Sequence, residues 1–194
     1  MQLKNKKIGF AMTGSYCTFS KVIEEMRTLK DTGADIMPIM SENVYSTDTR
    51  FGTADNFIME VKNITGKSII HNIKEAEPIG PKELLDLLIV APCTGNTLAK
   101  LANGITDTSV TLAVKAHLRN QKPVLLGVST NDGLGNAAKN IGMLLNSKCI
   151  YFIPFNQDDF ENKPNSLVAD IKKLVPAAEA ALDLKQLQPV LLRL

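Results

Sequence analysis

The chain has 194 residues, of which 44% are hydrophobic and 22% charged, and its formal net charge is +2. This length and composition predict one globular domain over residues 1–194, and the scattered basic residues argue against nucleic acid or an anionic membrane as the main partner. No apolar stretch approaches transmembrane length, and three cysteines without a CxxC pair suit reduced thiols, so we expect a cytoplasmic protein.

The first half of the chain alternates short apolar runs with amphipathic segments. Residues 7–13 form an apolar run that ends at Gly14, which is typical of a buried parallel strand. Apolar residues at three- and four-residue steps predict a helix from Phe19 to about residue 32. Residues 34–40 predict a second strand, in which Pro38 favours an edge or a bulge. The remaining predictions are a loop at 41–52, a helix at 53–65 that Gly66 ends, a short strand or extended segment at 67–73, and a loop at 77–81.

The second half continues this alternation. Residues 87–91 give the clearest strand, and two helices follow at 97–102 and 108–120, the second with Asp107 as its expected N-cap. The later predictions are a strand at 123–129, a helix at 136–146, a strand at 149–153, a loop at 156–164, a helix at 166–184 that Pro176 breaks or restarts, and an oligomer contact in the leucines after Gln188. Alternating strands and helices predict an α/β fold with three αβα layers, Rossmann-like or flavodoxin-like, whose parallel sheet has helices on both faces. In such folds ligands bind beyond the carboxyl ends of the strands.

The turn after the first predicted strand has features of an anion site. Gly14 allows the backbone to approach a ligand closely, Ser15 offers a hydroxyl, and the N-terminus of the following helix favours negative charge. Ser41, just past the second predicted strand, offers another hydroxyl. An ordinary turn explains the same residues, because one glycine does not make a GxGxxG or Walker loop.

The loop at 92–97, PCTGNT, places a thiol, two hydroxyls, a carboxamide and a glycine between a buried strand and a helix. A helix needs only one cap residue here, such as Thr94 or Asn96, so the excess of small polar groups indicates a planar or anionic ligand. Cys93 invites interpretation as a nucleophile. No base is identifiable beside it, and small buried cysteines are common.

A third polar loop, STNDG at 129–133, fits a plain turn and a binding loop equally well. His117 lies in a helical pattern and is expected at the surface or half-buried. His71 lies in an extended segment and by spacing alone is a bystander. The pair at 158–159 has no second acidic cluster at ligand spacing, so we predict no metal site.

Residues 90–108, VAPCTGNTLAKLANGITDT, resemble the APxxANTxAKxAxGxxD signature of the FMN-binding flavoproteins. That family includes phosphopantothenoylcysteine decarboxylase, the lantibiotic cysteine decarboxylases and the flavin prenyltransferases. The TGS turn at 13–15 and the loop at 129–133 fall in the order of the family's other motifs. The resemblance covers about residues 7–140 and implies an FMN cofactor and oligomers, commonly based on trimers, whose flavin sites lie at subunit contacts.

The resemblance also assigns cofactor-binding positions. Three residues match the positions that hold the FMN phosphate and ribityl chain, namely Gly14, Ser15 and Ser41. Three more match the loop that lies against the flavin and the substrate, namely Thr94, Asn96 and Thr97.

For catalysis, His71 matches the catalytic histidine of the decarboxylases' HIxL segment, and Asn131 matches the asparagine of their PxMN segment, which binds a substrate carboxylate. The proline and methionine of PxMN are replaced by Val128 and Thr130, and no cysteine-containing substrate flap is present near the C-terminus. These departures argue against decarboxylation of a cysteinyl thiol.

Within the family, the strings EAEPIGP, STNDGLG and YFIPFNQDD resemble a branch in which the flavoprotein is one subunit of a two-chain oxidoreductase. That resemblance implies aromatisation of a dihydropyridine dicarboxylate to pyridine-2,6-dicarboxylate in the mother cell of a sporulating bacterium, with NAD(P) on the partner subunit. His71 would then be the acid/base, and Asn131 and Asn96 would anchor carboxylates. Two alternatives stay open: an FMN-dependent decarboxylase or prenyltransferase relative, and a non-catalytic subunit that only binds a ligand.

Overall fold

The computed structural model describes residues 2–192. In this range the sheet has seven strands: β1 (Lys7–Met12), β2 (Asp35–Met40), β3 (Leu87–Cys93), β4 (Val124–Thr130), β5 (Ile150–Phe152), β6 (Phe155–Asn156) and β7 (Leu167–Ala169). The main part is parallel in the order β2-β1-β3-β4, with β5 parallel to β4. The short strands β7 and β6 continue the sheet antiparallel from the carboxyl end of β4.

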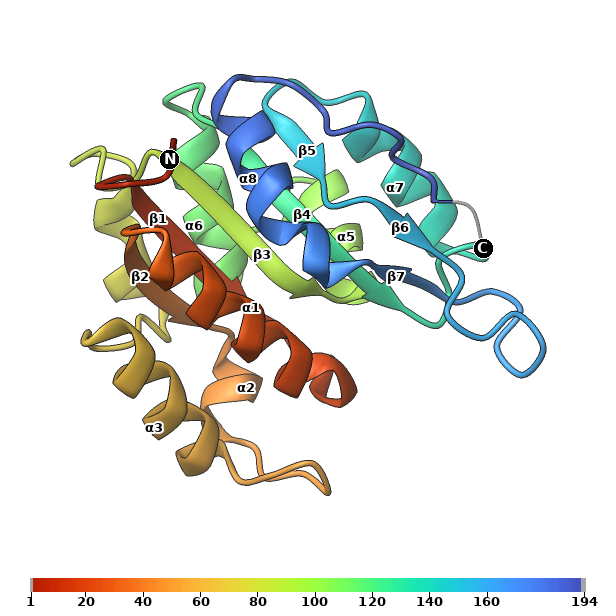
Figure 1. Ribbon diagram of the computed structural model, residues 1–194, viewed down its shortest axis with the longest axis horizontal. Coiled ribbons are helices and arrows are strands. Elements are labelled where there is room, and N and C mark those ends of the chain that lie inside the picture. The colour runs from red at the N-terminus through yellow and green to blue at the C-terminus, as the bar shows by residue number, and fades with distance from the viewer. Residues whose placement is uncertain (1, 193–194) are drawn as a thin grey trace.

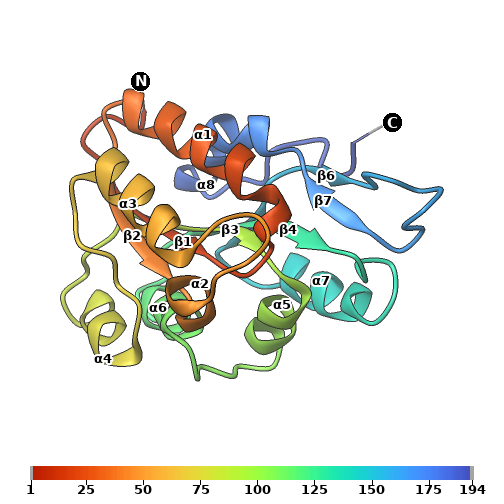
Figure 2. The same cartoon turned by 90° about the horizontal axis from the view of Figure 1, so that it is seen from below.

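Helices cover both faces of this sheet (Figure 1). They are α1 (Phe19–Asp31), α2 (Glu42–Ser46), α3 (Ala54–Thr65), α4 (Ile73–Ala76), α5 (Gly95–Ala102), α6 (Ser109–Leu118), α7 (Ala137–Leu145) and α8 (Leu174–Leu182), with 3-10 turns η1 (Tyr16–Thr18), η2 (Glu77–Ile79) and η3 (Ile171–Lys173). Figure 2 shows α1, α3 and α8 on one face and α4, α5, α6 and α7 on the other. The predicted αβα flavodoxin-like fold is therefore confirmed. None of these helices in residues 2–192 has the length and apolar character needed to cross a bilayer.

The central strand β3 explains how the two cores form. All seven of its residues are buried. Its side chains alternate between the faces, so that Ile89 packs in the core under α1 and α8 while Val90 packs in the core under α6. A strand covered on both faces has a continuous apolar sequence. This is the reason why the run at 87–91 is the clearest strand signal in the chain.

Local end signals set the bounds of the helices. The Thr53 side chain accepts a hydrogen bond from the Asn56 N–H and begins α3, and Gly66 ends it with φ +69°. The predicted cap of α6 is wrong: the Thr108 side chain accepts from the Thr111 N–H, while Asp107 binds Lys100 instead.

Several further predictions need correction. A short helix, α2, lies inside the predicted loop at 41–52, and the 3-10 turn η2 lies inside the predicted loop at 77–81. Residues 166–184 are not one helix, because β7 pairs with the end of β4 and only then does α8 begin, with Pro176 in its first turn. The pairing of Thr130 with Leu167 joins segments far apart in the sequence, which a local pattern does not reveal.

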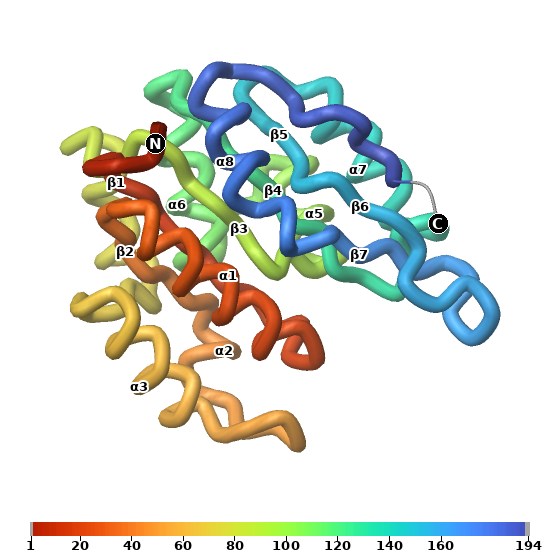
Figure 3. The backbone as a smooth tube through the Cα atoms, viewed as in Figure 1, coloured from red at the N-terminus to blue at the C-terminus, as the bar shows by residue number. Residues whose placement is uncertain are grey.

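The segment between β6 and β7 projects from one end of the molecule (Figure 3). Within it, Asp159 accepts hydrogen bonds from the backbone N–H and side chain of Asn162 at 3.1 and 3.0 Å. The Gln157 side chain donates to the Pro164 carbonyl at 2.8 Å. The segment is therefore a hairpin with its own internal bonds, and it lies beside the carboxyl ends of the central strands.

Candidate functional site

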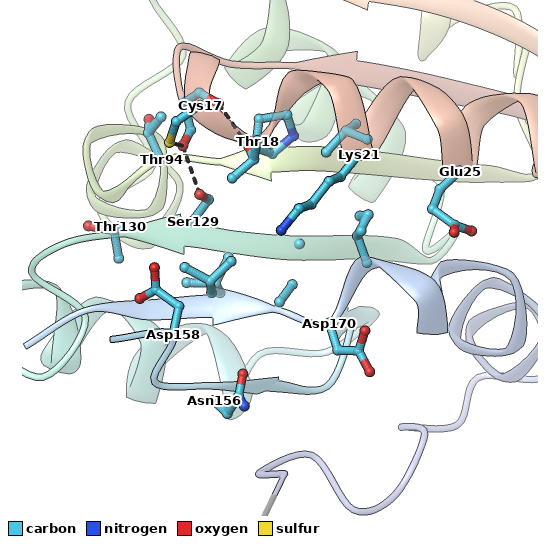
Figure 4. A pocket seen from close by; sticks show the side chains of 18 of the residues that line it. Cys17, Thr18, Lys21, Glu25, Thr94, Ser129, Thr130, Asn156, Asp158 and Asp170 are labelled. Atoms are coloured by element: carbon cyan, nitrogen blue, oxygen red, sulfur yellow. Dashed lines mark hydrogen bonds between the residues drawn. The ribbon is translucent and has the colours of Figure 1, made fainter. Parts of the chain in front are cut away.

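A cavity of about 1130 Å³ lies at the carboxyl ends of β1, β3 and β4. Helix α1 forms one wall and the β7 side of the sheet forms the other (Figure 4). Its volume is somewhat above the range of about 300–1,000 Å³ of typical small-molecule sites. The cavity therefore has room for more than one small ligand.

A network of hydroxyl groups connects the three loops that border this cavity. The Thr13 hydroxyl donates to the Pro92 carbonyl at 2.8 Å and accepts from the Thr94 N–H at 3.1 Å. The Ser15 and Ser129 hydroxyls share a hydrogen bond of 2.7 Å. These bonds link turns that are 79 to 114 residues apart in the sequence, so the loops are held in place without a ligand.

The β3 and β4 loops also approach each other closely. A Cβ atom on Gly95 would lie 2.7 Å from the Thr130 hydroxyl oxygen. Real Cβ atoms essentially never lie this close, so a larger residue here would displace the Thr130 side chain. Glycine at this position therefore allows the start of α5 to pack closely against the end of β4, where both line the cavity.

Four of the eight predicted site residues line the cavity, namely Gly14, Ser15, Thr94 and Asn131. They come from the ends of β1, β3 and β4, as the rule for parallel sheets predicts. The cavity thus unites the three polar loops that the sequence singles out.

Three predicted cofactor residues lie beside the cavity rather than in its wall. The Ser41 hydroxyl caps α2 by accepting from the Val44 N–H at 3.4 Å. Thr97 is buried, and its N–H donates to the Thr94 hydroxyl at 3.3 Å. Asn96 is exposed in the first turn of α5. Capping accounts for the hydroxyls of Ser41 and Thr94 in this chain.

His71 lies away from the cavity, close to the end of the edge strand β2. Its ring stacks on Tyr45 with 3.8 Å between centroids, and its Nδ1 lies 3.2 Å from the Glu75 carboxylate. The His71 side chain is 33% exposed. Hydrogen bonding from the His71 backbone N–H lowers the pKa of Glu75. In a single chain, this histidine therefore does not face the ligand cavity.

Two further residues have structural roles. Cys93 is fully buried and its burial raises the thiol pKa, which excludes it as a thiolate nucleophile. The prediction that His117 is surface or half-buried is wrong, since it is 1% exposed and its Nε2 donates to the Pro123 carbonyl at 3.0 Å. Burial lowers the His117 pKa to about 4. The apolar pattern of α6 has little amphipathic contrast, so the sequence does not show which face is buried.

Both walls of the cavity carry charged residues that the sequence analysis did not assign to a site. Lys21 comes from the first turns of α1, and Asp158 and Lys163 come from the β6–β7 hairpin. Lys163 pairs with Asp158 at 3.7 Å, and the Ser166 hydroxyl also donates to Asp158. The pairing of β7 with β4 brings this hairpin to the cavity, and no local motif indicates that pairing. Within residues 2–192, no group of three or more His, Cys, Asp or Glu side chains is arranged to hold a metal ion.

Comparison with known proteins identifies the family of this chain. The flavoprotein family model matches residues 1–164. The B subunit of dipicolinate synthase from Bacillus subtilis (strain 168) is 47% identical over 189 residues, which is 97% of this chain and 94% of that protein.

Solved structures agree with this similarity. The crystal structure of the dipicolinate synthase B subunit from Bacillus halodurans has 46% identity and a TM-score of 0.92, and covers 100% of this chain and 99% of its own. The FMN-dependent cysteine decarboxylase SpaF has 16% identity and a TM-score of 0.68 over 94% of this chain and 99% of its own. At that identity, SpaF shows a shared fold alone.

Proposed function

Since this chain belongs to the flavoprotein family, we propose that it is the B subunit of a dipicolinate synthase. With the A subunit of that enzyme it forms pyridine-2,6-dicarboxylate from a dihydrodipicolinate-type precursor in the mother cell of a sporulating bacterium. The observation that carries this proposal is the 47% identity to the Bacillus subtilis protein over 97% of the chain. Because the matched segment spans both the polar loops and the β6–β7 hairpin, it includes every wall of the cavity.

The cavity is chemically suited to FMN. A flavin mononucleotide needs hydroxyl and amide donors for its phosphate and ribityl chain, and an apolar surface for its ring. The Ser15–Ser129 hydroxyl pair supplies such donors at the mouth of the cavity. Val168 and Ile171, both partly exposed, supply apolar surface in its wall. These features support FMN as the cofactor of this chain. We place NAD(P) on the A subunit only because the family resemblance implies it.

In this proposal the residues of the loops have separate roles. Gly14 and Ser15 hold the phosphate at the turn before α1, and Ser41 stands at the neighbouring turn after β2. Thr94, Asn96 and Thr97 form the start of α5 against the flavin, where Thr94 is fixed by the Thr13 hydroxyl at 3.1 Å. Asn131, in the cavity wall, and Asn96 anchor the substrate carboxylates.

Aromatisation of a dihydropyridine removes a hydride and a proton. FMN, when bound, accepts a hydride equivalent. The chain itself must accept the proton, and His71 is the proposed acid/base. Because His71 lies outside the cavity of its own chain, this role requires a second copy of the chain to bring the histidine to the cavity mouth. That requirement agrees with the trimer-based assembly that the family resemblance implies.

A second candidate function follows from the position of His71 outside the cavity. Among residues 2–192, those that line the cavity include no histidine. If no second copy of the chain supplies one, the cavity binds its ligand without performing the proton transfer, and the chain is a binding subunit that organises its partner.

The two candidates are separated by reconstitution. The purified chain is loaded with FMN and mixed with the A subunit plus a source of dihydrodipicolinate, and the ultraviolet absorbance of pyridine-2,6-dicarboxylate is followed. We expect faster formation than the A subunit gives on its own, and faster formation with FMN than without it. A rate equal to that of the isolated A subunit, with FMN bound to this chain, contradicts the proposal and favours the binding role.

A further inference from the structure

The His71 ring is held on one face and at one of its two nitrogens. The face lies on the ring of Tyr45 in α2, with 3.8 Å between centroids and 11° between planes. Nδ1 lies 3.4 Å from the Ile69 carbonyl oxygen and 3.2 Å from the carboxylate of Glu75 in α4. Within residues 2–192, the polar contacts of the ring all fall on Nδ1. The ring therefore has a defined orientation in which Nε2 has no partner from its own chain.

The helix beneath the ring is itself anchored. Glu42, in the same helix as Tyr45, accepts a hydrogen bond from the Ser109 N–H at 2.9 Å. The Ser109 hydroxyl is fully buried and donates to the Met40 carbonyl at 2.7 Å. These bonds tie the start of α2 to the start of α6. An aromatic ring on an anchored helix restricts the motion of the imidazole stacked on it, and such restriction favours a group that must meet a substrate in one geometry.

The groups around Nδ1 decide which ring nitrogen carries the proton. A carbonyl oxygen and an ionised carboxylate can only accept hydrogen bonds. The Glu75 carboxylate also accepts from the His71 backbone N–H at 3.0 Å, and this bond lowers the pKa of Glu75, which keeps it ionised. A neutral imidazole in this place therefore carries its hydrogen on Nδ1 and its free lone pair on Nε2. A general base needs this arrangement, because the open nitrogen is the one that can take a proton.

An ordinary helix start accounts for only part of these contacts. The Asn72 side chain caps α4 by accepting from the Glu75 N–H at 3.0 Å, and the Glu75 carboxylate accepts from the backbone N–H of His71. Neither bond requires an imidazole at position 71. The contacts of Nδ1 and the stacking on Tyr45 involve the ring alone, so they point to a role for the imidazole itself.

We propose that Glu75 is a positioning residue that keeps the neutral His71 ring protonated on Nδ1 and presents Nε2 as the base. This inference rests on the proposed function, which makes His71 the acid/base, and it extends that function to a second residue and a particular atom. In the aromatisation, the proton of the dihydropyridine ring ends on Nε2 and the hydride ends on FMN, so atoms and electrons balance. The carboxylate beside Nδ1 then stabilises the imidazolium that has formed.

The test measures the tautomer of His71 by nitrogen NMR of the full-length chain at about pH 8, where an imidazole is ordinarily neutral. The chain has two histidines, and the signals of His71 are those that disappear in His71→Ala. We expect the Nδ1–H tautomer to predominate in the wild type. Glu75→Ala should lower the ratio of Nδ1–H to Nε2–H about threefold, as befits a partly exposed ion pair. Glu75→Gln keeps an acceptor oxygen without the charge and should restore part of the ratio.

The rate of the enzyme reconstituted with the A subunit gives the second readout. Glu75→Ala should lower kcat about tenfold and leave KM within about twofold of the wild type, because it alters the base and not the substrate contacts. Glu77→Ala is the matched control. Glu77 is exposed in η2 and forms no ion pair within residues 2–192, so its substitution removes the same charge and should change neither readout.

A predominant Nε2–H tautomer in the wild type overturns the inference. Equal tautomer ratios in Glu75→Ala and Glu77→Ala overturn it as well, whatever happens to the rate. The proposed function fails differently. If the ratio depends on Glu75 but His71→Ala reacts at the rate of the wild type, the positioning of the ring by Glu75 stands and the acid/base role of His71 does not.

Discussion

The two ends of the central strands differ in how their polar groups are bonded. At the amino end, the buried His117 bonds the backbone, with 3.0 Å between its Nε2 and the Pro123 carbonyl. At the carboxyl end, Thr13 also bonds the backbone, but the Ser15 and Ser129 hydroxyls bond each other across loops at 2.7 Å. Side chains that satisfy the backbone stabilise the fold, whereas paired hydroxyls beside a cavity can exchange their bond for one to a ligand.

This difference explains why sheets of this kind bind ligands at one end. Each parallel strand of the core leads into a helix or loop at its carboxyl end, so small polar residues from separate turns meet there. The following predictions test whether the two ends are as distinct as their hydrogen bonds indicate.

The largest expected effect is a pH-dependent change in the free energy of unfolding, caused by His117 at the amino end of the strands. Burial lowers the His117 pKa to about 4 from its ordinary value of 6.5. Below pH 6.5 the unfolded chain therefore binds a proton at His117, whereas the folded chain does not bind it until the pH approaches 4. The contribution of the neutral, buried imidazole to the free energy of unfolding is complete above pH 6.5 and is lost as the pH falls towards 4. Between about pH 7 and pH 4, the free energy of unfolding of the wild type should fall by about 3 kcal/mol more than that of His117→Gln. Urea denaturation at each pH measures this difference, and parallel curves would disprove it.

The second-largest effect is expected for His71, and it tests whether the edge of the sheet contributes to the site at the carboxyl end. If His71 is the acid/base, His71→Ala lowers the rate of pyridine-2,6-dicarboxylate formation about hundredfold, since general acid–base groups contribute at least that much. FMN binding stays unchanged. Tyr45→Leu, which removes the ring stacked on His71 but keeps the imidazole, serves as the control and should have a smaller effect. An unchanged rate in His71→Ala would show that this histidine takes no part in the reaction.

A third change tests how the loops at the carboxyl end are held. Thr13 is 3% exposed, and its hydroxyl bonds both the Pro92 carbonyl and the Thr94 N–H. Thr13→Val keeps the shape but leaves the Thr94 N–H unpaired, while the Pro92 carbonyl still accepts from the Thr13 N–H at 3.2 Å. Because one backbone donor loses its partner, we expect a loss of about 2 kcal/mol in the free energy of unfolding. Thr28→Val removes an exposed hydroxyl that bonds only the carbonyl of its own helix, and is the control. Equal losses would show that the Thr13 bonds do not hold the loops.

The smallest effect separates the two serines assigned to the phosphate. Ser15 lines the cavity, whereas Ser41 caps α2. Ser15→Ala should therefore weaken FMN binding about tenfold, as the loss of one hydrogen bond to a charged group implies. Ser41→Ala should change it less than about threefold and act on stability through the lost cap. The reverse order of affinities would place the phosphate at the turn after β2.

Much of this fold is predictable because its signals are local. The apolar run at 87–91 predicts β3, and Gly66 predicts the end of α3. The polar loops after β1, β3 and β4 also stand out in the sequence, and the strand-end rule brings them together.

What local pattern cannot show is the opposite wall of the cavity. The apolar spacing at 166–169 is also compatible with a helix. Residues 167–169 form β7 because Leu167 pairs with Thr130, which is far away in the sequence. That pairing brings the hairpin with Asp158 to the wall of the cavity that lies across from α1. The burial of His117 is likewise decided by packing against distant strands.

A flavin site at the carboxyl ends of β1, β3 and β4 is tested most directly by titrating FMN with the purified chain and following flavin fluorescence. We predict saturable binding at one FMN per chain, with a dissociation constant of about micromolar or tighter, and weaker binding by Ser15→Ala. Fluorescence that stays unchanged up to millimolar chain, whether or not the A subunit is present, would contradict it.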